Sequence, residues 1–147
     1  MKIMTNQPII IEQTYNVSSD KVWKTLTDNG EMKKWYFDID SFKSELGFEF
    51  HFTAGDDKNK YLHLCKIVEV IPGKKISYSW RYDGFEGNSL VSFELFDEGR
   101  QTRLRLTHSG LESFPKLPNF SPESFREGWN YILGTSLKDF LEKEDIK

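Results

Sequence analysis

Six side chains in the sequence have the chemistry for catalysis or metal binding: Glu49, His51, His63, Cys65, Glu69 and His108. None of them lies in a metal-ligand spacing such as His-Glu-x-x-His or paired Cys-x-x-Cys. His63 and Cys65 share one face of an expected strand, so the thiol could lie beside the imidazole as a nucleophilic pair. The alternative is that both side chains have only a structural role. Serine nucleophile elbows, phosphate-binding glycine loops and dinucleotide fingerprints are absent from the sequence. We therefore expect no catalytic residue, no metal site and no cofactor, and we favour a protein that is not an enzyme.

The elements that position these side chains are mostly strands. Apolar and polar residues alternate between turn signals at residues 9–17, 48–53, 61–71, 76–82, 90–96 and 102–108. Because the connections are short, this pattern predicts an antiparallel meander. In the last strand Leu104 and Leu106 are expected to face inward together with Thr102 and His108. In the strand at 61–71 two sets of apolar residues compete for the buried face, so a bulge is one explanation and the register stays open.

Two short helices are expected after the first strand. Ser18 or Ser19 offers an N-cap for the first helix, and a break at residues 28–30 separates it from the second. The apolar residues of this pair are Val22, Trp23, Leu26, Met32, Trp35 and Tyr36. They give each helix one face to bury.

One long amphipathic helix closes the chain. Ser121 is a suitable N-cap, with Pro122 at the first helical position and Glu123 in the first turn. Apolar residues then recur at helical spacing: Phe125, Trp129, Ile132, Leu133, Leu137 and Phe140. Gly128 and Gly134 lie inside this helix, where each costs about 1 kcal/mol relative to Ala, so either close packing or room for a ligand compensates.

Together these elements predict an α+β fold in which a curved antiparallel sheet wraps around the long C-terminal helix. A lone long helix has to bury its apolar stripe, and the sheet is the one large surface that the sequence offers. Such a two-layer arrangement tends to leave a cavity between helix and sheet. We expect a single domain over residues 1–147, with its core at about 9–141.

Composition excludes several classes of partner. The net charge is -3 and basic residues are scattered among acidic ones, which argues against binding nucleic acid. No apolar run approaches the roughly 20 residues that span a bilayer, so no membrane insertion is expected. The N-terminus has too short an apolar run for a signal peptide, and the single cysteine cannot form an intramolecular disulfide. We therefore expect a cytoplasmic protein, whose oligomeric state the sequence leaves open.

Several short motifs, in their order along the chain, resemble a known family. They are Val22-Trp23, Lys34-Trp35-Tyr36, Ile76-Ser77-Tyr78-Ser79-Trp80, Thr102-Arg103-Leu104-Arg105-Leu106-Thr107-His108-Ser109-Gly110 and Gly128-Trp129. From about residue 9 to 141 the chain looks like a START-like (SRPBCC) helix-grip protein, of the branch related to the C-terminal domain of the heat-shock-protein-90 ATPase activator. The resemblance implies a helix-grip fold enclosing an apolar cavity, and a His108 that hydrogen-bonds the following loop rather than acting as a base. Because the superfamily includes lipid carriers, hormone receptors and polyketide cyclases, it implies no single function.

Three functions remain to be weighed. The preferred one is the binding of a small hydrophobic molecule in the cavity, with Tyr or His groups orienting a polar end of the ligand. The expected ligand-binding residues are Trp35, Phe50, Phe52, His63, Tyr78, Trp80, Phe93, His108, Trp129 and Leu133. The first alternative is a protein-interaction module of the chaperone-ATPase-activator type, with a protein partner, and the second is a cavity enzyme similar to a cyclase or hydrolase. Whether the aromatic side chains fill the core or line a void stays open at this stage.

Overall fold

The computed structural model describes residues 8–55 and 58–145, the side chains of 143–145 excepted. The first residues of the chain, on which the expectation of no signal peptide rests, lie outside this part. In the part described, no helix is long and apolar enough to cross a membrane.

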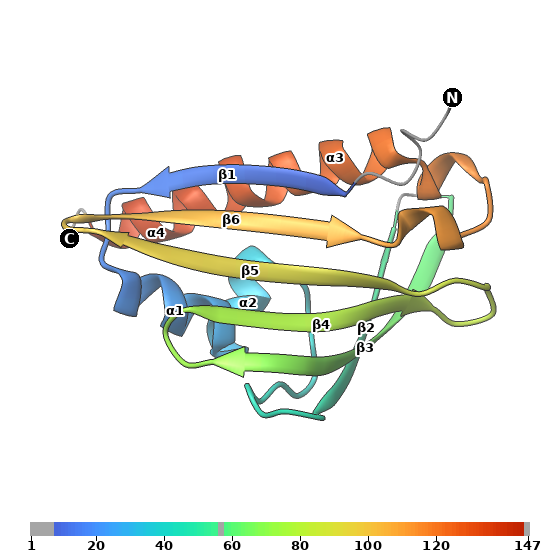
Figure 1. Cartoon of the computed structure of the whole chain (residues 1–147), viewed down its shortest axis with the longest axis horizontal. Coiled ribbons are helices and arrows are strands. Elements are labelled where there is room, and N and C mark those ends of the chain that lie inside the picture. Colours follow the sequence, from blue (N-terminus) through green and yellow to red (C-terminus); the bar gives the residue numbers. More distant parts are fainter. Residues whose placement is uncertain (1–7, 56–57, 146–147) are drawn as a thin grey trace.

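Six strands form one antiparallel sheet, in the order β1-β6-β5-β4-β3-β2. They are β1 (Ile9–Tyr15), β2 (Glu49–Gly55), β3 (Lys60–Ile71), β4 (Lys75–Tyr82), β5 (Ser89–Glu98) and β6 (Gln101–Ser109). Strands β2 to β6 follow one another as a meander, and β1 pairs with the last of them (Figure 1). The chain turns sharply at Gly73 and Gly99, which adopt φ values of 79° and 83° that only glycine takes without strain. The expected meander is confirmed.

A β-bulge in β3 resolves the register that the sequence leaves open. Ile67 pairs with Tyr78 and Glu69 with Ser77, so Val68 is the extra residue. Before the bulge, His63, Cys65 and Ile67 point to the buried face, while Val68 itself is exposed. The bulge bends the strand, as bulges generally do, and it leaves both reactive side chains of β3 inside the fold.

Two short helices, α1 (Ser19–Thr27) and α2 (Asn29–Trp35), follow β1. Ser18 caps α1 by accepting a hydrogen bond from the Lys21 amide, and Asp28 caps α2 by accepting one from Glu31. The expected break is shorter than predicted, because Asp28 alone ends one helix and starts the next. The stripe of α1 also differs in detail: Thr25 is buried with Val22 and Leu26, and Trp23 is only partly buried.

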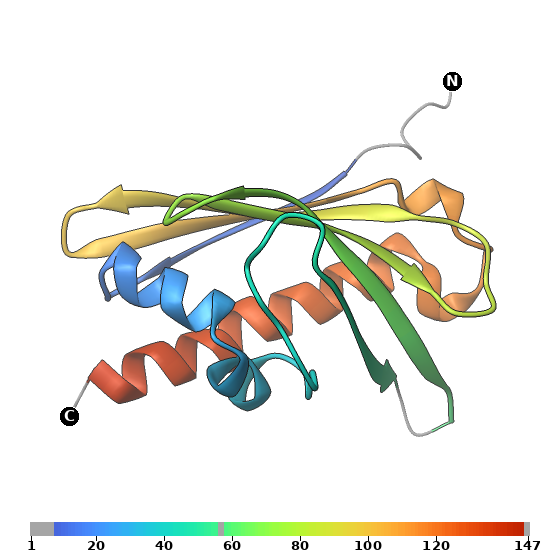
Figure 2. The ribbon, with the colours of Figure 1, turned by 90° about the horizontal axis from the view of Figure 1, so that it is seen from below.

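The C-terminal helix lies against the concave face of the sheet, with α1 and α2 beside it (Figure 2). It consists of α3 (Pro122–Tyr131), a π-helical segment η4 (Ile132–Leu137) and α4 (Lys138–Asp145). Two single turns, η2 (Leu111–Ser113) and η3 (Pro118–Phe120), lead into it from β6. Ser121 caps α3 with Pro122 at its first position, as predicted. This arrangement confirms the helix-grip fold.

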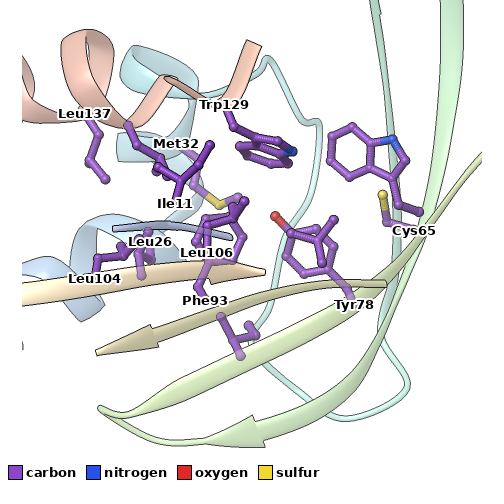
Figure 3. Close-up of a cluster of buried hydrophobic side chains, with 14 of the residues drawn as sticks. Ile11, Leu26, Met32, Cys65, Tyr78, Phe93, Leu104, Leu106, Trp129 and Leu137 are labelled. Carbon is purple, nitrogen blue, oxygen red and sulfur yellow. The ribbon is translucent and has the colours of Figure 1, made fainter. Parts of the chain in front are cut away.

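The core fills the space between the helix and the sheet. Figure 3 shows Trp129 and Leu137 on the helix and Phe93, Leu104 and Leu106 on the sheet among the buried side chains between the two layers. All five are almost completely buried, and Thr102 and His108 share the inner face of β6 with the two leucines as expected. Burial of this apolar surface holds the helix to the sheet.

The π-helical segment is fixed by hydrogen bonds from neighbouring elements. The Tyr15 hydroxyl of β1 donates to the Leu133 carbonyl oxygen at 2.7 Å, and Ser136 donates to the Trp35 carbonyl oxygen at 2.6 Å. A β-carbon at Gly134 would lie 3.1 Å from the side-chain amide nitrogen of Gln13 on β1. A β-carbon at Gly128 would have no atom within 4 Å. Position 134 therefore lies close to the Gln13 side chain, and open space lies beside Gly128.

Replacing Tyr15 by Phe is expected to lower the free energy of unfolding by about 1–3 kcal/mol, because the buried Leu133 carbonyl loses its side-chain donor. Urea unfolding monitored by circular dichroism measures this loss. Tyr131→Phe, at an exposed position of the same helix, serves as the control and is expected to stay within about 0.5 kcal/mol of the unchanged protein. Equal stability of the two variants would contradict a structural role for the Tyr15 hydroxyl.

Candidate functional site

A pocket of about 450 Å³ lies between the sheet and the C-terminal helix. Strands β3 and β4 contribute Tyr61, His63, Trp80 and Tyr82 to its wall, because inward-facing residues recur at every second position of a strand. The helix contributes Phe125, Gly128, Trp129, Tyr131, Ile132 and Ser136, which lie on the helix face toward this end of the sheet. The end of α2 and the residues after it add Trp35, Tyr36 and Phe37. The result is a wall made largely of aromatic rings.

The wall carries no charged side chain in the part of the chain that the structure describes. Its polar groups are the hydroxyls of tyrosines and serines, the Asn119 amide and the His63 imidazole. Asn119, in η3, donates to the Tyr61 hydroxyl at 3.0 Å and so joins η3 to the start of β3. An uncharged wall of this kind suits an uncharged ligand, because an ion would lose its hydration without gaining a partner.

Four of the ten ligand-binding residues expected from the sequence line this pocket: Trp35, His63, Trp80 and Trp129. The other six lie in the packed core next to it and are not part of the wall: Phe50, Phe52, Tyr78, Phe93, His108 and Leu133. Phe93, for example, meets the edge of the Trp129 ring at 5.9 Å between centroids. Aromatic rings from the segment after α2 pack against several of these positions, as Phe42 does against Phe50 and Phe37 against Phe52, so the rings there fill the core rather than surround a void.

Several wall residues are not among the ten ligand-binding residues expected from the sequence: Tyr36, Phe37, Tyr61, Tyr82, Asn119, Phe120 and Phe125. Tyr82 follows Trp80 at the two-residue spacing of one strand face, and Tyr61 precedes His63 in the same way, so both carried a usable signal. Asn119 and Phe120 come from η3, where no periodicity exists that could have placed them.

His63 is buried among aromatic rings. Its ring stacks on Phe52 at 4.4 Å between centroids and meets the edge of Trp80 at 5.0 Å. Its Nδ1 lies 3.0 Å from the Tyr61 carbonyl oxygen, an acceptor, so Nδ1 carries the proton and donates it. Burial lowers the pKa of His63 to about 4, although the backbone groups of Tyr61 and Phe52 near the ring act in the opposite direction. The imidazole is therefore neutral at neutral pH.

His108 takes part in a hydrogen-bonded chain inside the core. The indole N–H of Trp129 donates to His108 Nδ1 at 3.0 Å, which fixes the proton of the neutral ring on Nε2. Nε2 then donates to the Ser89 hydroxyl at 2.8 Å, and Ser89 donates to the Trp80 carbonyl oxygen at 3.0 Å. Burial lowers the pKa of His108 to about 3.

The expectation that His108 bonds the following loop is thus wrong. Its partners are the first residue of β5 and a residue of α3, because the side chain points into the core between these elements. Both ring nitrogens are occupied, so His108 holds the helix to the sheet. It does not line the pocket.

Two tyrosine hydroxyls meet beside the pocket. Tyr36, which lines the wall, lies 2.7 Å from Tyr78 between the two hydroxyl oxygens. Burial raises the pKa of both groups well above the ordinary value of 10, so both keep their protons. One hydroxyl donates to the other, and the remaining O–H is left as a donor without an acceptor among the hydrogen bonds of the described residues.

The thiol of Cys65 is free and buried. Burial raises its pKa far above the ordinary value of 9, so the nucleophilic thiolate is disfavoured. His63, two residues before it, holds its Nδ1 proton toward the Tyr61 carbonyl. Within residues 8–55 and 58–145, no group of three His, Cys, Asp or Glu side chains is arranged to hold a metal ion.

Solved structures similar to this one come from several bacteria. The Mll3558 protein of Rhizobium loti has a TM-score of 0.79 and 23% identity, over 92% of this chain and 96% of its own. CalU16 of Micromonospora echinospora has a TM-score of 0.70 and 26% identity, over 91% of this chain and 73% of its own. The Aha1 dimer of Colwellia psychrerythraea has a TM-score of 0.65 and 25% identity, over 90% of this chain and 93% of its own.

The sequence also matches a protein family. Residues 16–142 match the family described as Activator of Hsp90 ATPase homolog 1-like protein. This match spans most of the 147 residues and agrees with the helix-grip fold and with the resemblance seen in the sequence motifs. The chain therefore belongs to the Activator of Hsp90 ATPase homolog 1-like family.

Proposed function

We propose that the protein binds a small, uncharged, aromatic molecule in the pocket between the sheet and the C-terminal helix. The observation that carries the proposal is the wall itself: about 450 Å³ of space, surrounded mainly by aromatic rings and free of charged side chains among the described residues. Ligand sites in proteins have this character, with an apolar lining and a few placed polar groups. Membership of a family with a helix-grip fold is compatible with such a function.

The indole rings give the proposal a direct readout. Three of the four tryptophans, Trp35, Trp80 and Trp129, line the pocket. A ligand that enters it displaces water from these rings and changes their emission. Because it binds the folded state alone, it also raises the melting temperature.

Gly128 allows a sharp test. No atom lies within 4 Å of a β-carbon placed there, and the residue lines the pocket. Gly128→Phe is expected to fill the pocket and to weaken the binding of 2-methoxynaphthalene more than about tenfold, since the ligand and the new ring compete for one volume. The titration follows tryptophan emission.

Gly128→Ala is the matched control. Like the Phe variant, it removes a glycine from the helix interior, a change worth about 1 kcal/mol in favour of folding for Ala, but it adds one methyl group only. This variant is expected to bind within about threefold of the unchanged protein. Equal binding by the Phe and Ala variants would contradict the proposal, as would failure of the unchanged protein to bind either 2-methoxynaphthalene or 2-naphthol at the solubility limit of the probe.

The second candidate function is a protein-interaction module, and family membership is the observation that favours it. In that case the outer face of the sheet or its loops would contact a chaperone, and the interior would serve folding alone. The test is the ATPase rate of a purified Hsp90 with and without this protein. A stimulated rate that Gly128→Phe leaves unchanged would support this candidate over ligand binding.

A further inference from the structure

The orientation of the His63 ring is fixed by the protein. Nδ1 donates its proton to the Tyr61 carbonyl oxygen, and the ring is held between Phe52, on which it stacks, and the edges of Trp80 and Tyr82. In a neutral imidazole the second nitrogen is then a hydrogen-bond acceptor with a free lone pair. The pKa of about 4 means that this lone pair is present at neutral pH.

That second nitrogen, Nε2, has no hydrogen-bond partner among the residues that the structure describes. Every fully buried side-chain nitrogen and oxygen in the same part of the chain does have a partner. Nε2 must therefore reach an accessible surface, even though only 6% of the His63 residue is exposed. Since His63 lines the pocket, that surface is the pocket wall.

An acceptor in this position discriminates between ligands. When a purely apolar molecule fills the pocket, it removes water from Nε2 and leaves the lone pair unsatisfied, which costs binding free energy. A ligand that places an O–H against Nε2 keeps the hydrogen bond. Sites built around one polar group reject analogues that cannot satisfy it.

We propose that His63 determines ligand specificity by accepting a hydrogen bond at Nε2 from a hydroxyl group of an aromatic ligand. This inference rests on the proposed ligand-binding function and names the chemical class: a flat, uncharged aromatic alcohol or phenol. The rings of the wall hold the aromatic body. The absence of charged side chains from the described wall disfavours an aromatic carboxylate or amine.

The test compares 2-naphthol with 2-methoxynaphthalene, which share the ring system but differ in the O–H donor. Titrations follow tryptophan emission, with the melting temperature as a second measure. The unchanged protein is expected to bind 2-naphthol about tenfold more tightly. Equal affinities would overturn the role of His63 and leave the proposed function standing. Binding of neither compound would overturn both.

Two variants test whether the preference for 2-naphthol over 2-methoxynaphthalene depends on His63. His63→Phe keeps an aromatic ring and removes Nε2, so its two affinities are expected to agree within about twofold. His51→Phe, the control, changes an exposed histidine in the neighbouring strand β2 and is expected to keep the full preference. A His63→Phe protein that still prefers 2-naphthol tenfold would refute the proposal.

A spectroscopic measurement on the unchanged protein avoids the risk that a variant misfolds. The chain has three histidines, so their ring nitrogens can be resolved by ¹⁵N NMR. Adding 2-naphthol is expected to shift the Nε2 signal of His63 in the direction of an accepted hydrogen bond, and adding 2-methoxynaphthalene is not. An unchanged Nε2 signal in a protein saturated with 2-naphthol would also refute the proposal.

Discussion

Lowering the pH from about 7.5 to about 5 is expected to reduce the free energy of unfolding by about 4 kcal/mol through two buried histidines, His63 and His108. Burial lowers the pKa of these residues from 6.5 to about 4 and about 3, respectively. Below pH 6.5, the pKa of these histidines in the unfolded chain, the unfolded state binds protons that the folded state does not bind. Their contribution to stability is therefore complete above pH 6.5 and falls as the pH drops toward the folded values. At about pH 5 each histidine accounts for roughly 2 kcal/mol of the loss.

Urea unfolding at the two pH values measures this difference. His63→Gln and His108→Gln are each expected to retain about half of the loss, because one of the two titrating groups is gone. His51→Gln removes an exposed histidine on the other face of the sheet and is expected to retain all of it. The difference between the two pH values is compared within each protein, so a variant of lower overall stability remains informative.

An NMR titration of the folded protein gives an independent result. The ring signals of His63 and His108 are expected to remain those of neutral imidazole down to about pH 5. If either ring titrated near pH 6.5 in the folded protein, that histidine would not contribute to the loss of stability at low pH.

Replacing Trp129 by Ala is expected to cost more than 3 kcal/mol of the free energy of unfolding. Loss of a buried Trp side chain costs about 3–5 kcal/mol in transfer and cavity terms, and Trp129 is 2% exposed. The same change leaves His108 Nδ1 without its donor, at a further cost of roughly 1–3 kcal/mol. Chemical denaturation measures the sum.

Two further variants separate these contributions. Trp129→Phe keeps most of the ring packing and removes the indole N–H, so its cost is expected to lie between those of the unchanged protein and Trp129→Ala. Tyr131→Ala truncates an aromatic residue two positions away that is 64% exposed, and is expected to change stability by about 0.5 kcal/mol or less. A similar cost at Trp129 and Tyr131 would show that the helix is not held through the Trp129 contacts.

The local elements of this fold follow from the sequence alone, because their determinants lie within a few residues of one another. Ser18 and Ser121 cap helices through the backbone amides three residues later. Gly73 and Gly99 turn the chain between adjacent strands. Two-residue alternation correctly places Leu104 and Leu106 on the inner face of β6. These signals, in order along the chain, were enough to predict a sheet gripping a C-terminal helix.

Features that depend on contacts between distant residues were not predictable in the same way. The sequence allowed a bulge in β3, and the pairing of β3 with β4 places it at Val68. The partners of His108 lie 19 and 21 residues away, on β5 and α3. The π-helical segment receives its hydrogen bond from Tyr15, 118 residues before Leu133. No local pattern contains this information.

The residues of the candidate site were likewise predictable only in part. Alternation correctly identified the aromatic residues that face inward, but it could not tell which rings line a space and which fill the core. Phe93 and Trp80 both point inward, yet only Trp80 lies at the pocket, whereas Phe93 packs among the rings of Tyr36, Tyr78 and Trp129. The sequence thus determined which side chains enter the interior. Tertiary packing decided where the space remains, since a void is the difference between the volume that the layers enclose and the volume that their side chains occupy.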